Sequence, residues 1–225
     1  MQVLDGNSTL ANVFGRGPDT FYNRFAKRWF DVAVSATALV ALAPLLGAVS
    51  LAVWRRHGRP ILFRQVRTGV NGEAFEILKF RTMTNERDEQ GNLLPDKARL
   101  TALGKWLRET SIDELPELWN VLRGEMSLVG PRPLLHRYMQ HYDDRQARRH
   151  EARPGITGWV AVNGRNTTTW EARFEMDVFY VENLGPLLDV KILMKTIATV
   201  LSREGVDPGF ADQMPEFGAP RQTTN

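Results

Sequence analysis

The sequence has no cysteine and only four histidines in 225 residues. The missing cysteine excludes disulfide frameworks, thiol nucleophiles and thiolate metal sites. The histidines show none of the spacings of a zinc site. The chain also lacks a Walker phosphate loop, a Gly-x-Gly-x-x-Gly turn, a Gly-x-Ser-x-Gly motif and internal repeats. The common nucleotide-binding and hydrolase motifs are therefore excluded.

Charge of one sign is not in large excess, because the net charge is only +3. This value does not indicate nucleic acid as a partner, and we expect none. The basic residues cluster at both ends of an apolar segment and again near residue 150: Arg24, Lys27 and Arg28; Arg55, Arg56 and Arg59; Arg145, Arg148, Arg149 and Arg153. This placement fits an anionic membrane surface or phosphorylated ligands.

Residues 32–53 contain no charged side chain and form one long apolar run. As a helix, such a run is long enough to cross the hydrocarbon layer, which needs about 20 residues. Pro44 lies at its centre, where it removes one backbone donor and frees the carbonyl of Val40. The sequence therefore predicts a membrane helix that is kinked or broken at Pro44.

The basic residues at both ends of this run bear on its topology. Positive charge favours the cytoplasmic side, so a straight crossing would place one basic cluster outside. A re-entrant helix broken at Pro44 keeps both clusters inside and is the form we expect, with an ordinary kinked crossing as the alternative. Residues 41–43 resemble a signal-peptide cleavage site, but the apolar run continues past them and a proline follows at once.

The rest of the chain predicts an α+β fold that is rich in helix. Two strand-like segments within residues 60–83 meet at Asn71-Gly72, which is the strongest short hairpin signal. Helices are expected at 100–109, 136–153, 170–184 and 187–201, with a polar surface loop at 84–99 and a short apolar strand within 154–166. The helix at 136–153 presents its arginines to headgroups or to solvent, and the last two helices are core or interfacial amphipathic helices.

Two adjacent carboxylates, Asp113 and Glu114, stand beside a helix-start signal. With Ser111 as N-cap, Glu114 completes a capping box. With Asp113 as N-cap, Pro116 is tolerated in the first turn. Either start places both carboxylates at the positive end of the helix dipole, which also attracts phosphate. The alternative is that these residues do no more than cap a helix.

Several cations and amides are candidate ligands for a phosphorylated substrate. Arg132 is fixed between two prolines, which suits bidentate phosphate binding. The other candidates are Lys79 and Arg81 at the end of the second strand, Arg108, and Asn163, Arg165 and Asn166 for a base or sugar. For Lys79 and Arg81 the alternative is a solvated strand edge, and for Arg132 it is a structural turn.

Taken in order, eight segments resemble the bacterial sugar transferases, specifically the monotopic polyprenyl-phosphate phosphoglycosyl transferases. The matching segments are residues 27–31, 63–65, 79–83, 107–116, 120–124, 127–133, 154–158 and 162–166. Each is weak alone, but the ordered set is specific and covers about residues 24–205. The chain resembles the short form that consists of the catalytic unit only.

This resemblance implies a two-step reaction at the cytoplasmic face of a bacterial inner membrane. In that family an aspartate attacks the β-phosphate of a UDP-sugar and releases UMP, and polyprenyl phosphate then accepts the phosphosugar. On this chain the resemblance makes Asp113 the nucleophile and Glu114 the Mg²⁺ ligand, with Lys79, Arg108 and Arg132 binding the diphosphate. A carboxylate attacking a phosphate needs such cations to offset repulsion, and hard oxygen ligands suit Mg²⁺.

The resemblance also divides the chain into four parts. These are an N-terminal extension at 1–23, a re-entrant membrane helix at 24–56, a catalytic domain at 57–205 and a tail at 206–225. Residues 84–99 and 159–170 are expected to shape the sugar pocket. One departure concerns the helix break, where relatives often carry Ser-Pro and this chain has Ala43-Pro44. Two other functions remain open: a metal-dependent glycosyltransferase that releases UDP, and a non-catalytic membrane-surface scaffold.

Overall fold

The computed structural model describes residues 22–163, 169–202 and 217–218. As predicted, the fold is rich in helix and contains two small sheets. The α-helices are α2 (Lys27–Ala41), α3 (Ala43–His57), α4 (Asp96–Arg99), α5 (Ala102–Glu109), α6 (Glu117–Arg123), α7 (Asp144–Ala147), α8 (Trp159–Asn163), α9 (Trp170–Glu182) and α10 (Pro186–Ser202). The π-helical turn η1 (Tyr22–Ala26) precedes α2, and the 3₁₀ turns are η2 (Val70–Gly72), η3 (Ile112–Glu114), η4 (His136–His141) and η5 (Arg148–Glu151).

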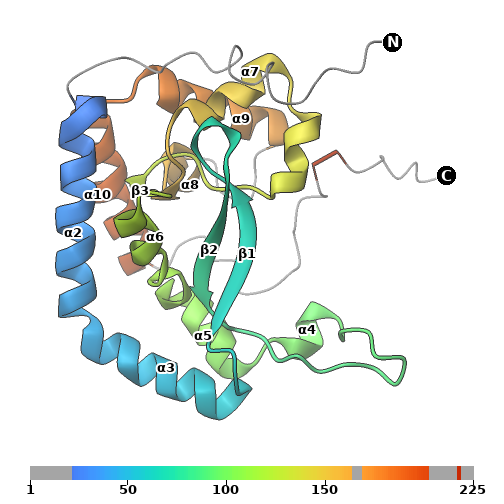
Figure 1. Cartoon of the computed structure of the whole chain (residues 1–225). Helices are drawn as coiled ribbons and strands as arrows, with labels where there is room; N and C mark the ends of the chain where they lie inside the picture. The colour runs from blue at the N-terminus through green and yellow to red at the C-terminus, as the bar shows by residue number, and fades with distance from the viewer. Residues whose placement is uncertain (1–21, 164–168, 203–216, 219–225) are drawn as a thin grey trace, which may run out of the picture.

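The predicted hairpin is confirmed and forms the centre of the molecule (Figure 1). Strands β1 (Leu62–Thr68) and β2 (Ala74–Phe80) pair antiparallel in register from Leu62 opposite Phe80 to Thr68 opposite Ala74. The turn passes through Asn71 and Gly72, both with positive φ, which these two residue types accept most readily. A second, two-stranded sheet joins β3 (Ser127–Val129) to β4 (Gly155–Thr157) in parallel.

The predicted break at Pro44 is also confirmed. Helices α2 and α3 meet at an angle of 64° and form an L along one side of the molecule (Figure 1). Pro44 is the second residue of α3, where its missing N–H costs no helical hydrogen bond. Within the described residues, neither helix alone has the length and apolar character to cross a membrane, but the bent pair together does.

One face of α2 carries polar residues that are buried in the protein. Lys27, Asp31 and Ser35 recur every four residues and so lie on one side of the helix. Lys27 Nζ lies 2.5 Å from the carboxylate of Asp189 on α10, and Asp31 accepts a hydrogen bond from the Leu128 amide at 3.1 Å. These contacts dock α2 against β3.

Two of the basic residues that precede the apolar run therefore serve the fold. Lys27 is buried, and Arg28 donates to the carbonyls of Val121 and Leu122 at the end of α6. Cations commonly satisfy the free carbonyls of a helix C-terminus in this way. Lys27 is thus not available to a membrane surface or a phosphorylated ligand, contrary to the prediction, whereas Arg28 is only partly buried. At the other end, by contrast, Arg55, Arg56 and Arg59 are exposed.

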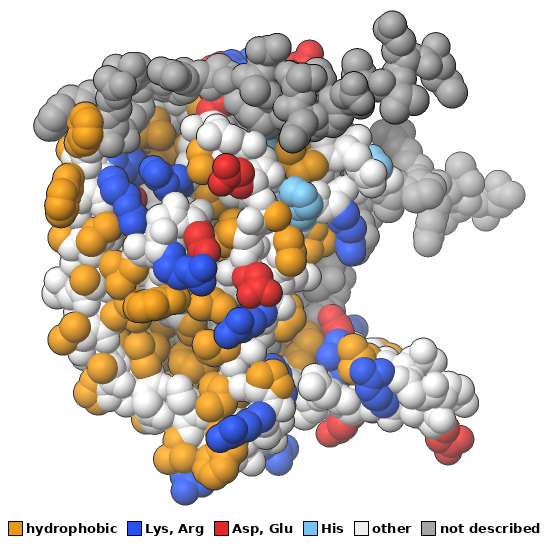
Figure 2. Space-filling model, in the orientation of Figure 1, with side chains coloured by type: hydrophobic (Ala, Val, Ile, Leu, Met, Phe, Trp, Pro, Cys, Tyr) orange, Lys and Arg blue, Asp and Glu red, His pale blue; other side chains and the backbone are white. Residues whose placement is uncertain are grey.

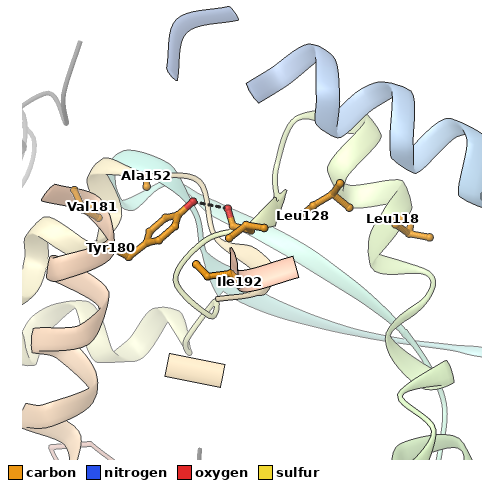
Figure 3. Close-up of a cluster of buried hydrophobic side chains, with 7 residues drawn as sticks. Leu118, Leu128, Ala152, Tyr180, Val181 and Ile192 are labelled. Carbon is orange, nitrogen blue, oxygen red and sulfur yellow. Dashed lines mark hydrogen bonds between the residues drawn. The ribbon is translucent and has the colours of Figure 1, made fainter. Parts of the chain in front are cut away.

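The main core lies between α6, β3, α9 and α10 (Figure 3). It contains Leu118, Leu128, Val129, Ala152, Tyr180, Val181 and Ile192. The Tyr180 hydroxyl lies 3.0 Å from the Val129 carbonyl oxygen and 2.8 Å from Asp189 Oδ1, so its one proton has an acceptor and its polar end is satisfied. A second core joins Val49 and Val53 of α3 to Phe80 of β2 and Leu107 of α5. Both cores fix the segments that carry the charged residues described next.

Two predicted elements are corrected by the structure. The helix expected at 136–153 is broken into η4, α7 and η5, because Asp143 caps a new turn with a full capping box and interrupts the run. The strand expected within 154–166 is only β4; the apolar residues after Gly158 form the short helix α8 instead. Short apolar runs do not distinguish a strand from a helix by pattern alone.

The arginines of 145–153 do not face headgroups as one surface. Arg149 is buried against Asp177, whereas Arg145 and Arg148 pair with acids on α9. Arg153 donates to the Gly124 carbonyl at 3.1 Å. The helices expected at 170–184 and 187–201 are confirmed as α9 and α10.

Candidate active site

A cavity of about 1220 Å³ lies beside the hairpin. Its charged lining includes residues from β2, α5, η3 and the segment after β3, with others from β1, α4 and α9. Helices α8 and α10 supply apolar residues such as Val160 and Leu193. Residues of the loop at 84–99 also line it, among them Asn85 and Leu93. In Figures 1 and 2 this loop projects from the body of the molecule, and Figure 2 shows a hollow above it.

Asp113 lines this cavity from η3 and is only 9% exposed. Burial raises the pKa of its carboxyl from the ordinary 3.8 to about 6, with a further contribution from the negative charge of Glu114. Lys79, Arg108 and Arg132 act in the opposite direction. Asp113 is therefore still mostly ionised at neutral pH, but its charge is held in a poorly hydrated place.

Glu114 is paired with two cations. Lys79 Nζ lies 2.5 Å and Arg132 Nη2 lies 2.6 Å from the same oxygen, Oε1. Burial by itself would raise the pKa of Glu114, but Arg132 and Lys79 outweigh it and hold that pKa well below the usual range. The same interaction raises the pKa of Arg132. Glu114 is thus ionised at any physiological pH.

The predicted helix start at Ser111 or Asp113 was wrong. Ser111 has φ of 54° and its side chain accepts no capping hydrogen bond, and α6 begins only at Glu117, after Pro116. Residues 112–114 form a separate 3₁₀ turn instead. In it the Glu114 amide donates to the Ser111 carbonyl, and the Leu115 amide donates to the Ile112 carbonyl. Neither carboxylate caps α6, so capping does not account for the pair.

Glu117 is a third carboxylate of this cluster, which sequence reasoning did not single out. It is 2% exposed, and its Oε1 lies 3.2 Å from Lys79 Nζ. Burial and the neighbouring charge of Glu114 raise the pKa of Glu117 to about 7. The signal that could have found it is its spacing of three residues from Glu114, which places side chains together on helical turns.

Arg132 is held by the backbone around it. Strand β3 leads into Gly130, where a Cβ would stand 2.2 Å from the Arg153 carbonyl, so only glycine permits this approach. The Gly155 amide then donates to the Pro131 carbonyl at 3.0 Å, and Arg149 donates to the Arg132 carbonyl at 2.7 Å. Arg132 is therefore presented to Glu114 from a fixed support.

Arg81 also lines the cavity, but its surroundings differ from those of Lys79. It is 6% exposed, and its Nε and Nη1 make no hydrogen bond within the part of the chain that the structure describes. No acid among those residues forms an ion pair with it. Nearby, Arg108 Nε donates to the Thr82 hydroxyl at 3.1 Å. Buried donors without partners are candidate sites for an ion or a water molecule.

Of the candidates for the base or sugar, Asn163 does not line the cavity. Its Oδ1 accepts from Lys195 at 2.8 Å and its Nδ2 donates to the Trp159 carbonyl, so both ends of the amide are engaged at the surface. The preceding residues Ala161 and Val162 do line the cavity. Arg165 and Asn166 lie outside the described residues.

The carboxylates fit Mg²⁺ only as part of a site that substrate completes. No three His, Asp or Glu side chains among the described residues come together as a ready-made metal site. Glu114 has one suitable oxygen, because both cations bond to Oε1 and no described residue donates a hydrogen bond to Oε2. Mg²⁺ is commonly held by one or two carboxylates together with substrate phosphates. Glu114 therefore fits such an ion.

The chain matches the family described as bacterial sugar transferase over residues 22–203. It is 52% identical over 181 residues to EpsL, an uncharacterized sugar transferase of Bacillus subtilis, covering 80% of this chain and 89% of EpsL. It is 40% identical to the undecaprenyl-phosphate glucose phosphotransferase of Komagataeibacter xylinus, covering 82% of this chain but 37% of that protein. For the undecaprenyl-phosphate galactose phosphotransferase of Salmonella typhimurium the identity is 36%, over 81% of this chain and 42% of the relative.

The chain thus spans most of one relative and less than half of two longer ones. The match includes both the bent helix pair and the carboxylate cluster. The chain belongs to the bacterial sugar transferase family and is a transferase.

Proposed function

We propose that this chain transfers a phosphosugar from a UDP-sugar to polyprenyl phosphate, with undecaprenyl phosphate as the acceptor. The names of the two longer relatives support this acceptor. The observation that carries the proposal is the placement of a buried, ionisable Asp113 in a cavity next to Lys79, Glu114 and Arg132. This is a carboxylate nucleophile beside the cations that an anionic substrate needs.

In the first step, an oxygen of Asp113 attacks the β-phosphorus of the donor. A new O–P bond forms, and the bond from that phosphorus to the bridging oxygen breaks, so UMP leaves with the bridging oxygen and its electron pair. Lys79 and Arg132 exchange part of their contact with Glu114 for contact with the diphosphate. Arg108 and Arg81, which also line the cavity, bind the same diphosphate.

In the second step, a phosphate oxygen of the polyprenyl phosphate attacks the phosphorus held on Asp113. The O–P bond to Asp113 breaks and the carboxylate is regenerated. The product is polyprenyl-diphosphate sugar. The donor and the acceptor react in turn at the same carboxylate, so UMP leaves before the acceptor reacts.

Glu114 Oε2 and the substrate phosphates would hold Mg²⁺, which supplies neutralising charge for the diphosphate. The chain's own cations remain necessary, because Lys79 and Arg132 also keep Glu114 ionised and in place. The role of this chain is therefore to orient the diphosphate and to keep one buried carboxylate free for attack.

We further propose that the enzyme is monotopic in the bacterial inner membrane, with its catalytic domain on the cytoplasmic face. The 64° bend between α2 and α3 supports a re-entrant helix rather than a straight span. The exposed Arg55, Arg56 and Arg59 at the end of α3 suit an anionic headgroup layer. This placement brings a lipid-borne phosphate to the level of the cavity.

The test is to weigh the purified protein after mixing it with a UDP-sugar panel and Mg²⁺, without lipid acceptor. We expect one donor to release UMP and to leave a phosphosugar adduct that peptide mapping assigns to Asp113. The matched variant Asp144→Asn, at an exposed carboxylate of α7, should form the same adduct. Release of UDP would support direct glycosyl transfer instead, and lipid-linked product without any adduct would refute the aspartyl intermediate.

A further inference from the structure

Phe217 occupies an aromatic pocket formed by η4, the residue that follows it, and α9. Its ring centroid lies 4.9 Å from that of Phe174 in an edge-to-face contact and 5.4 Å from that of Tyr142 in a stacked one. Trp170 and Tyr138 complete the pocket, with ring centroids at 5.7 and 5.8 Å from Phe217. Such aromatic pairs are favourable beyond the area that they bury.

The residue after Phe217 is suited to this position. Gly218 has φ of 79°, and a Cβ on it would stand 2.5 Å from a ring atom of His141. A larger residue would need both a strained backbone and a displaced His141. Glycine at residue 218 thus permits the close approach of the chain to His141 at the end of η4.

The aromatic pocket also supports a buried ion pair. The Arg149 guanidinium lies 5.9 Å from the ring centroid of Phe174. Its Nε and Nη2 donate to Asp177 Oδ2 at 2.9 and 2.8 Å. Arg149 and Asp177 are 2% and 4% exposed, so this pair has little freedom to move by itself.

Arg149 connects this pair to the candidate active site. Its Nη2 donates to the Arg132 carbonyl at 2.7 Å, and the Arg132 side chain in turn contacts Glu114 at 2.6 Å. An unbroken series of contacts thus runs from Phe217 through Phe174 and Arg149 to Arg132.

We propose that this aromatic pocket is a docking site for the chain's own C-terminal segment, and that docked Phe217 positions Arg132 through Phe174 and Arg149. The proposal rests on the proposed function where it concerns turnover. Phe217 and Arg149 are positioning residues, because neither lines the cavity. When Phe217 is undocked, Phe174 loses one face of its packing, and the Arg132 backbone is held less firmly.

The test uses the full chain and two undocking variants, Phe217→Ala and Gly218→Val. With UMP release as the readout, both should raise the donor KM about fivefold and change kcat by less than about twofold, since Arg132 orients the donor. Phe217→Tyr retains the ring and should restore the wild-type KM. The proposal would be overturned if the undocking variants lowered kcat without changing KM. It would also be overturned if Phe217→Tyr did not restore the wild-type KM.

A double-mutant cycle separates positioning from a general loss of structure. If Phe217 acts through Arg132, then Phe217→Ala should have no further effect on KM in an Arg132→Lys background. If its role is only structural, the two losses should multiply, and the proposed connection is then wrong.

Hydrogen–deuterium exchange of the free protein tests docking without any substrate. Phe217→Ala should speed exchange in peptides covering residues 130–136 and leave those covering α3 unchanged. Unchanged exchange at 130–136 would refute the docking effect even in an active enzyme. If no UDP-sugar yields UMP with the wild-type chain, the proposed function fails instead, and the exchange result still decides the docking.

Discussion

Lys79 and Arg81 are two cations of one cavity, only two residues apart along the hairpin, yet their surroundings are opposite. Lys79 contacts the carboxylates of Glu114 and Glu117 at 2.5 and 3.2 Å. Arg81 is buried, with its Nε and Nη1 unbonded and no acid partner among the described residues. We call Lys79 and Arg132 with their acids the paired end of the cavity, and Arg81 the unpaired end.

The difference bears on how the proposed diphosphate substrate is bound. At the paired end, acids balance the cations, so the geometry persists without substrate, and in the proposed reaction the charges are redistributed when the diphosphate binds. At the unpaired end, burial of the Arg81 guanidinium destabilises the protein without substrate, and the proposed diphosphate would supply acceptors for it. The paired end thus holds its cations in position before substrate binds, and the unpaired end gains free energy when substrate binds.

The largest effect should follow from changing Asp113, the proposed nucleophile, which lies beside the paired end. Asp113→Asn keeps the size of the side chain but removes the attacking carboxylate. We expect phosphosugar transfer to fall by at least about 1000-fold, with no adduct by mass spectrometry. Asp144→Asn, prepared in parallel, should retain full activity. Activity of Asp113→Asn within tenfold of wild type would refute Asp113 as the nucleophile.

The same substitution should stabilise the free protein in a pH-dependent way. Burial that lifts the Asp113 pKa from 3.8 to about 6 costs about 3 kcal/mol of stability when the group is ionised. Stability from protonated Asp113 is complete below about pH 3.8 and is lost as the pH rises through about 6, because the folded chain binds the proton more tightly. Asp113→Asn should therefore raise Tm at neutral pH, measured in detergent with a chelator.

The control for this stabilisation is the pH itself. The Tm difference between Asp113→Asn and wild type should shrink as the pH falls toward about 4, where both side chains are neutral. A Tm gain that is the same at both pH values would show that a contact other than the buried charge is responsible.

Part of this structure could be predicted from the sequence. The hairpin, the break at Pro44 and helices α5, α9 and α10 follow from local signals, namely Asn71-Gly72, a central proline and apolar periodicity. The grouping of Lys79, Glu114 and Arg132 was predicted from motifs that resemble a family. Their mutual contacts come from three separate segments and could not be read from spacing.

The wrong predictions share a physical cause, which is tertiary competition with a local signal. Ser111 has the side chain of an N-cap, but the turn at 112–114 and Pro116 delay α6 to Glu117. Arg149 and Lys27 are charged and were expected at a surface, but each has a buried acid from a distant segment, Asp177 and Asp189. A sequence does not reveal such partners, since they are 28 and 162 residues away.

The next effect should come from Glu114, which connects both cations of the paired end. Glu114→Gln removes the negative charge that Lys79 and Arg132 share. We expect turnover to fall about 100-fold and the Mg²⁺ concentration for half-maximal rate to rise, as judged from UMP release across a Mg²⁺ series. Glu175→Gln, which removes an exposed acid on α9, should leave both quantities unchanged. An unaltered Mg²⁺ dependence in Glu114→Gln would assign the metal to other oxygens.

The smallest effect on rate should follow from removing the charge at the unpaired end. Arg81→Met keeps the length of the side chain without its guanidinium. Donor KM should rise about tenfold, since a charged hydrogen bond to phosphate contributes about 1.5 to 3 kcal/mol. Stability without substrate should increase by about 1 kcal/mol, because buried N–H groups without partners are lost.

Lys79→Met is the matched change at the paired end and should do the reverse, lowering stability because Glu114 and Glu117 lose their shared cation. If both variants shift Tm in the same direction, the two ends do not differ in the way that their contacts indicate.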